Sequence, residues 1–279
     1  MIDDLARPRG PYSLTLTARF AGDATRRFRD ERLVALLPER AEAWQLRDGR
    51  VRLRAENEEA LERLRFVLAL DDDHSEFVRR FRRDPLLGRS VQELRGLRVL
   101  RVPTVAGALL RAVCGQLVDS KSARLQERRI VRALAPAGAE GLHEPPTSAT
   151  FAALAPLELR RLGLAERKAA ALVRLCRSLD LERLRTVPTP AVVSRIVRER
   201  GLGPWSAGVV CLQGLGRREH GLVGDLGLVK LLGAMRGRPV EGWETAELLE
   251  PYGEWAGLAS VYLLAGHGRG LVPVSARAA

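Results

Sequence analysis

The amino-acid sequence predicts an α+β chain in which a small N-terminal antiparallel-sheet unit precedes an all-helical body. Apolar and polar residues alternate with period two at residues 12–20 and again at 44–55, which is typical of half-buried strands. After residue 72 this alternation stops, and apolar residues recur at helical spacing instead. We therefore expect an N-terminal α+β unit over residues 1–72 and a helical body over residues 73–279.

Local signals predict the elements of both parts. Residues 12–20 are expected to form a strand, and residues 44–55 a hairpin that turns at Asp48 and Gly49, because Asp-Gly between alternating runs favours a tight turn. The acidic run from Asp71 to His74 lies at a helix boundary and is interpreted as a linker or N-cap rather than a metal site. Helical patterns are found at residues 58–70, 75–83, 105–118, 122–135, 149–154, 156–161, 166–178, 190–200, 205–213, 226–235, 245–250 and 254–265.

Composition narrows the classes of partner. The formal net charge of +12 favours a polyanion, because binding releases the counterions of its phosphates, although a basic surface without any partner would carry the same charge. No apolar run approaches the about 20 residues that a membrane helix needs, and residues 1–10 lack the apolar core of a signal peptide. We expect a cytoplasmic, nucleoid-associated protein without a membrane partner.

Cysteine and lysine are scarce. The three cysteines are widely spaced without a Cys-x-x-Cys pair, so we expect reduced core residues and no metal site. The only side chains that could act as amine nucleophiles are those of Lys121, Lys168 and Lys230.

A short turn joins the helical patterns at 190–200 and 205–213. Gly201 can adopt positive φ and end the first helix, and Leu202 can plug the space between the two helices. Gly203 leaves backbone amides uncovered, and Pro204 suits the first turn of the next helix. Free N–H groups at a helix N-terminus can clamp a phosphate, although an ordinary helix–turn–helix corner would have the same pattern.

Asp225 lies directly before the apolar pattern at 226–235 and is expected to cap that helix. Capping is compatible with catalysis, because the helix N-terminus favours the ionised carboxylate, which can then face a cationic sugar.

In this order, the segments 201–207 (Gly-Leu-Gly-Pro-Trp-Ser-Ala) and 224–228 (Gly-Asp-Leu-Gly-Leu) resemble the hairpin and catalytic-aspartate blocks of the helix-hairpin-helix DNA glycosylases. The most similar branch is that of the bacterial DNA-3-methyladenine glycosylase II enzymes. Residues 111–118 resemble that branch's Gly-Gln-(Leu/Gln)-Val segment, and residues 252–255 resemble the start of its final core helix. With the N-terminal α+β unit, the resemblance spans nearly the whole chain.

The resemblance implies a role for each matching residue. Asp225 would be the catalytic carboxylate, and Leu117 would wedge into the duplex where the damaged base has left. The DNA-binding residues would be Gln116, Leu117, Gly201, Leu202, Gly203, Trp205 and Ser206. The base pocket would be lined by Trp205, Val209, Trp255 and Leu264. The family often holds a monovalent cation through hairpin carbonyls, for which Glu199 and Leu202 are the candidates, and we expect no other cofactor.

Some alternatives stay open for single residues. Gln116 could contact DNA or satisfy a buried backbone group, and Leu117 and Trp205 could be core residues. Val209 and Leu264 stand where the best-known members of the branch have aromatic side chains, and Ala256 stands in place of an arginine, so the pocket is expected to be less aromatic.

The predicted function is a monofunctional DNA glycosylase, active as a monomer on double-stranded DNA, that flips out and excises alkylated bases of the 3-methyladenine type in base excision repair. Bifunctional relatives place a lysine two positions after the second hairpin glycine; here that position is Trp205, which cannot form a Schiff base. The alternatives are a glycosylase for oxidised or deaminated bases, a non-catalytic DNA-binding damage sensor, and a helical scaffold whose charge is incidental.

Overall fold

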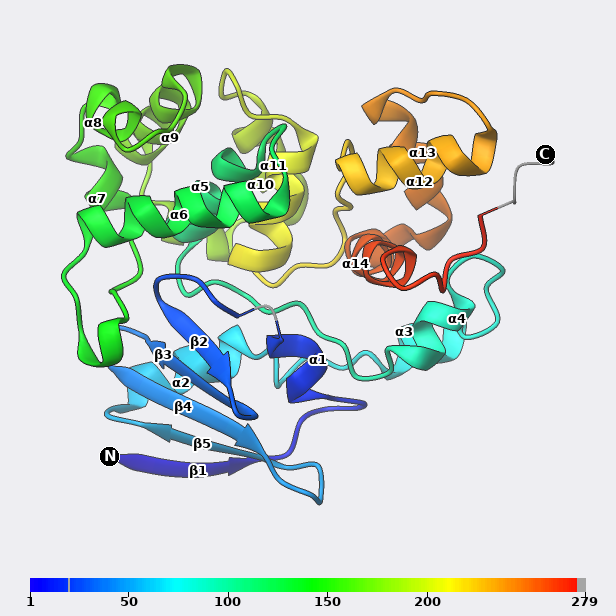
Figure 1. Ribbon diagram of the computed structural model, residues 1–279, viewed down its shortest axis with the longest axis horizontal. Coiled ribbons are helices and arrows are strands. Elements are labelled where there is room, and N and C mark those ends of the chain that lie inside the picture. Colours follow the sequence, from blue (N-terminus) through cyan, green and yellow to red (C-terminus); the bar gives the residue numbers. More distant parts are fainter. Residues whose placement is uncertain (20, 275–279) are drawn as a thin grey trace.

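A computed structural model describes residues 1–19 and 21–274. The first part of the chain forms one antiparallel sheet in the order β1-β5-β4-β3-β2, with α2 (Glu58–Val67) packed against it (Figure 1). Leu61 and Leu64 of this helix share a buried cluster with Leu33 and Leu53 of the sheet. The strands are β1 (Ile2–Ala6), β2 (Arg26–Arg29), β3 (Arg32–Leu36), β4 (Arg40–Gln45) and β5 (Val51–Ala55). The predicted N-terminal antiparallel sheet is confirmed.

The hairpin predicted at residues 44–55 is confirmed, because β4 and β5 pair in antiparallel register and Gly49 turns with φ +85°. The strand predicted at residues 12–20 is wrong. The chain forms α1 (Leu14–Ala18) there, and the Ser13 side chain caps it by accepting the Leu16 N–H at 3.2 Å. Leu14, Thr17 and Ala18 are buried at i, i+3 and i+4, a helical spacing hidden within the alternating pattern; residue 20 lies outside the described residues.

The rest of the described chain, up to residue 274, is helical, as predicted, and every predicted helical segment has a counterpart. The short helix α4 was not predicted. The helices are α3 (Ser75–Phe81), α4 (Gly88–Glu93), α5 (Val105–Gly115), α6 (Ser120–Leu134), α7 (Ser148–Ala152), α8 (Pro156–Arg161), α9 (Glu166–Ser178), α10 (Thr189–Val197), α11 (Pro204–Val209), α12 (Leu226–Arg236), α13 (Thr245–Leu249) and α14 (Ala256–His267). Among the described residues, none of these helices is both long and apolar enough to cross a bilayer.

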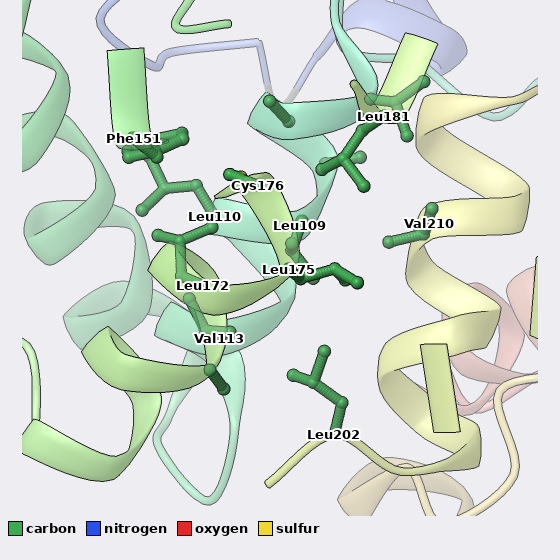
Figure 2. Packing of buried hydrophobic residues seen from close by; sticks show 14 of the residues in the cluster. Leu109, Leu110, Val113, Phe151, Leu172, Leu175, Cys176, Leu181, Leu202 and Val210 are labelled. Carbon is green, nitrogen blue, oxygen red and sulfur yellow. The ribbon is translucent and has the colours of Figure 1, made fainter. Parts of the chain in front are cut away.

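Two hydrophobic clusters fill the helical part, and the segment formed by α11 and the turn that continues it takes part in both. Val210 belongs to the cluster built mainly from α5 to α10, where Leu202 packs with Val113 and Leu175 (Figure 2). Val209 belongs to the cluster built from α3, α4 and α12 to α14. The residues that follow α11 form a π-helical turn, Val210–Gly214. The hairpin therefore lies at the junction of two cores, where ligand sites commonly form.

Charged side chains join the sheet to the helices. Arg111 of α5 donates to Asp23, next to β2, at 2.7 Å and to Glu127 of α6 at 2.8 Å. The acidic run before α3 also makes local contacts, because Asp72 pairs with Arg101 and Asp73 accepts the Ser75 N–H at 2.8 Å. The run was expected to be a linker or N-cap, and it leads directly into α3, whose N-cap residue His74 makes no side-chain capping bond.

Candidate active site

The turn between α10 and α11 has the predicted conformation. Gly201 has φ +96°, and Leu202 is buried in the cluster shown in Figure 2. The first bond of the following helix runs from the Ala207 N–H to the Gly203 carbonyl at 3.1 Å. The N–H groups of Trp205 and Ser206 precede that bond at the helix N-terminus, where such groups have no partner within the helix. A Cβ on Gly203 would meet nothing within 4 Å, so a ligand can approach this turn closely.

Asp225 caps α12, as predicted. Its Oδ1 atom accepts the Gly227 N–H at 2.8 Å and the Leu228 N–H at 3.4 Å. Gly224, with φ +86°, makes the turn that precedes it, and its N–H donates to the Thr245 hydroxyl at 2.7 Å. Because two helix amides share one oxygen, the carboxylate is held in one orientation and its second oxygen faces away from the helix.

The second oxygen of Asp225 is bound by the hairpin helix. The indole Nε1–H of Trp205 donates to Asp225 Oδ2 at 2.9 Å. Trp205 is partly exposed and also packs on the end of α5, where a Cβ on Gly115 would lie only 2.7 Å from its ring. Trp205 therefore contacts two of the sequence blocks singled out above, the aspartate turn and the end of α5.

Gln116 and Leu117 follow directly after α5. The Gln116 Nε2 group donates to the Gly201 carbonyl at 2.8 Å and to the Ser206 hydroxyl at 3.1 Å. The Gly201 carbonyl that Gln116 binds is exposed rather than buried, and a contact between Gln116 and DNA stays a prediction. Leu117 is 88% exposed and has φ +57°, a left-handed conformation that is unfavourable for leucine. The alternative of a core leucine at position 117 is therefore wrong.

The other predicted pocket residues differ in their relation to Asp225. Leu264 of α14 lies against its turn, because a Cβ on Gly227 would be 2.5 Å from the Leu264 side chain. Val209 is buried one turn after Trp205. Trp255 is only 1% exposed, and its ring is covered by the Arg218 guanidinium at 3.8 Å and by Phe77 at 5.6 Å. The ring of Trp255 is therefore enclosed by protein in this structure, and its role in a base pocket stays a prediction.

The carbonyls considered for a cation lie within the hairpin. The Glu199 carbonyl accepts the Leu202 N–H at 3.0 Å, which leaves it one further lone pair. A monovalent cation at Glu199 and Leu202 stays a prediction.

Two residues near the site were missed in the sequence. Lys168 of α9 donates to the Gln116 carbonyl at 2.7 Å, which no local pattern signals because the partners are far apart in the chain. Trp243 is 65% exposed on the turn that packs against the Asp225 turn, where a Cβ on Gly242 would lie 3.4 Å from Gly224. The exposure of Trp243 is the signal that marks it, and exposure is decided by the fold rather than by the local sequence.

No protein-family profile matches the chain. A relative from Bacillus subtilis, DNA-3-methyladenine glycosylase, is 26% identical over 230 residues, which cover 78% of this chain and 75% of the relative. The solved structure of a 3-methyladenine DNA glycosylase from Archaeoglobus fulgidus superposes with a TM-score of 0.82 at 18% identity, over 96% of this chain and 99% of that one.

A third similar protein is an 8-oxoguanine glycosylase/lyase from Clostridium acetobutylicum, solved with double-stranded DNA containing cytosine opposite 8-oxoguanine. Its TM-score is 0.78 at 16% identity, over 97% of this chain and 99% of that one. The two solved structures share the fold of this chain, and the Bacillus relative adds similarity in sequence. The chain therefore has the fold of the helix-hairpin-helix DNA glycosylases and is similar in sequence to one DNA glycosylase.

Proposed function

We propose that the protein is a monofunctional DNA glycosylase that excises alkylated bases of the 3-methyladenine type from duplex DNA in base excision repair. The observation that carries this proposal is the Asp225 carboxylate, held between the amides of α12 and the indole of Trp205. The similarity to the Bacillus subtilis DNA-3-methyladenine glycosylase supports the choice of substrate.

The chemistry needs a carboxylate in this environment. Breaking an N-glycosidic bond develops positive charge on the sugar, as in the oxocarbenium-like transition states of glycoside hydrolysis. The Asp225 oxygens have lone pairs beyond those used by the helix amides and Trp205, so the carboxylate can face that charge or accept a proton from water. A base inside a duplex must first be flipped out, at a cost of a few kcal/mol.

The proposal is tested by incubating the protein with duplexes that carry alkylated, oxidised or deaminated bases and measuring the free base released. We expect release of 3-methyladenine. Because the fold is also similar to that of an 8-oxoguanine glycosylase/lyase, the duplex with an oxidised base must be assayed alongside the alkylated one. Release of only oxidised or deaminated bases would change the substrate class, and tight, salt-sensitive duplex binding without any release would favour a damage sensor.

We expect no strand cleavage to accompany base release. Trp205 stands at the hairpin position where bifunctional relatives have their lysine, and an indole cannot form a Schiff base with the abasic sugar. The measurement is borohydride trapping on an abasic duplex, with gel analysis that omits the alkaline step. A trapped covalent complex would contradict the monofunctional assignment, and the variants Lys121→Met, Lys168→Met and Lys230→Met would locate the amine.

Replacing Leu117 with alanine should impair base flipping without destabilising the free protein. The side chain is 88% exposed, so it contributes little to the fold, whereas a wedge buried in the base stack would lose about 1.5–2 kcal/mol of apolar burial. We therefore expect single-turnover excision from a paired lesion to slow about tenfold to thirtyfold. Leu157→Ala, at another exposed leucine, is the matched control, and equal rates for wild type and Leu117→Ala would refute the wedge.

A further inference from the structure

The strained conformation of Leu117 needs a cause within the protein. A left-handed leucine costs about 1–2 kcal/mol, and the exposed side chain makes no packing interactions that would compensate. A loop that was free to relax would move this residue to a commoner conformation. Contacts of the neighbouring residue must therefore hold the backbone in place.

Gln116 is held at both its side chain and its backbone. Its amide group donates to the Gly201 carbonyl and the Ser206 hydroxyl, which ties it to the hairpin. Its own carbonyl, the last backbone group before Leu117, accepts a hydrogen bond from Lys168 Nζ at 2.7 Å. Together these contacts fix the peptide plane that sets the direction in which Leu117 leaves α5.

Lys168 is well suited to this contact. It lies on α9, the helix that also packs under the hairpin, where a Cβ on Gly201 would be 3.7 Å from Ala171. Its side chain is partly buried, whereas Lys121 and Lys230 are exposed. A compact ammonium can donate to a single carbonyl in a narrow space, where the planar fork of an arginine would need more room. Burial lowers the pKa of Lys168, although the neutral amine would still carry N–H donors.

We propose that Lys168 is a positioning residue that holds the Gln116 carbonyl and thereby keeps Leu117 in the exposed, strained conformation in which it enters the duplex. This role rests on the proposed function, because it assumes that Leu117 is the wedge. Lys168 contacts neither the base nor the sugar in this assignment and acts only through Gln116. Because the free protein already holds Leu117 in this conformation, the loop needs less rearrangement when the base is flipped out.

The test is a double-mutant cycle on wedge insertion. The probe is a duplex with a tetrahydrofuran abasic analogue beside 2-aminopurine, whose fluorescence rises when the stack is opened, and this readout needs no catalysis. We expect the rise to fall at least about threefold in both Lys168→Met and Leu117→Ala, and the double variant to lose no more than either one. Lys121→Met, which removes an exposed lysine near the same loop, should behave as wild type.

The base-release assay adds a second comparison. Lys168→Met should slow excision about tenfold from a paired lesion but less than about twofold from a single-stranded one, where no stack has to be opened. Three results would each overturn the proposal. They are a fluorescence rise in Lys168→Met as large as that in the wild type, losses of fluorescence that add up in the double variant, and no fluorescence rise in the wild type. Absence of base release with an intact fluorescence cycle would instead refute the proposed function. If Lys168→Met fails to fold, Lys168→Leu, which also lacks a donor for the Gln116 carbonyl, takes its place in the cycle.

Discussion

Asp225→Asn is expected to lower the single-turnover rate of base release by about 10²–10³-fold, the loss typical when one electrostatic stabiliser of a transition state is removed. Asparagine caps helices about as well as aspartate, so the Gly227 and Leu228 amides keep an acceptor and α12 should remain folded. What is lost is the negative charge. The new amide nitrogen also faces the Trp205 indole, which can donate but not accept, so that hydrogen bond is lost as well.

Two measurements separate a chemical loss from a structural one. Affinity for an abasic-analogue duplex should change less than about threefold, because phosphate and wedge contacts do not involve the carboxylate. Asp180→Asn is the matched control, since Asp180 caps the 3₁₀-helix Leu181–Thr186 by accepting the Glu182 N–H at 3.2 Å. A loss of less than about tenfold in Asp225→Asn would show that another group carries the chemistry.

Arg111→Met is expected to lower the free energy of unfolding by about 3–5 kcal/mol, because it removes the ion-pair partner of the nearly buried Glu127 carboxylate and one of the two arginine partners of Asp23, the other being Arg26. Arg111 pairs with Asp23 at 2.7 Å and with Glu127 at 2.8 Å, and its third partner is the Gln213 side chain at 3.1 Å. Methionine fills much of the same volume but cannot compensate either charge. The measurement is the urea dependence of unfolding, in which the midpoint should fall without a large change in slope.

Removing the Glu127 charge together with its partner tests this explanation. In the double variant with Arg111→Met and Glu127→Gln, Asp23 keeps its ion pair with Arg26, so no carboxylate of this cluster is left unpaired and most of the lost stability should be recovered. Failure to recover any stability would mean that Arg111 acts through packing alone. Arg161→Met, at an exposed arginine, provides the comparison for a simple loss of surface charge.

The ion pairs of Asp23 with Arg26 and Arg111 predict that the free energy of unfolding decreases in acid. Burial by itself would raise the pKa of the Asp23 carboxyl, but Arg26 and Arg111, with hydrogen bonds from Thr25, hold that pKa well below its usual value. The stability contributed by Asp23 is therefore complete above about pH 4, the unfolded value, and is lost as the pH falls towards the lower folded pKa. In this acidic window the unfolding free energy of Asp23→Asn should fall less steeply than that of the wild type.

Much of the helical part could be predicted because its signals are local. Apolar residues at helical spacing between Gly and Pro breaks indicated each of the longer helices, and Asp48 and Gly49 indicated the β4–β5 hairpin. The β2–β3 hairpin was missed because its turn places Asp30 and Glu31 at φ +49° and +58° without any glycine. In residues 12–20 an alternating pattern and a helical one coincide, and only burial distinguishes them.

The sequence alone determined which residues this protein has available for chemistry: a glycine-rich turn before a helix, an aspartate at the next helix N-terminus, and a tryptophan at the hairpin position where the resemblance would place a lysine in bifunctional glycosylases. Each of these depends on a few neighbouring residues, whose backbone preferences act locally. The tertiary structure decided what those residues contact. It joined Trp205 to Asp225 and Lys168 to Gln116, exposed Leu117 and covered Trp255. Such contacts join residues far apart in the chain, and they form only after burial of two hydrophobic cores has fixed how the helices pack.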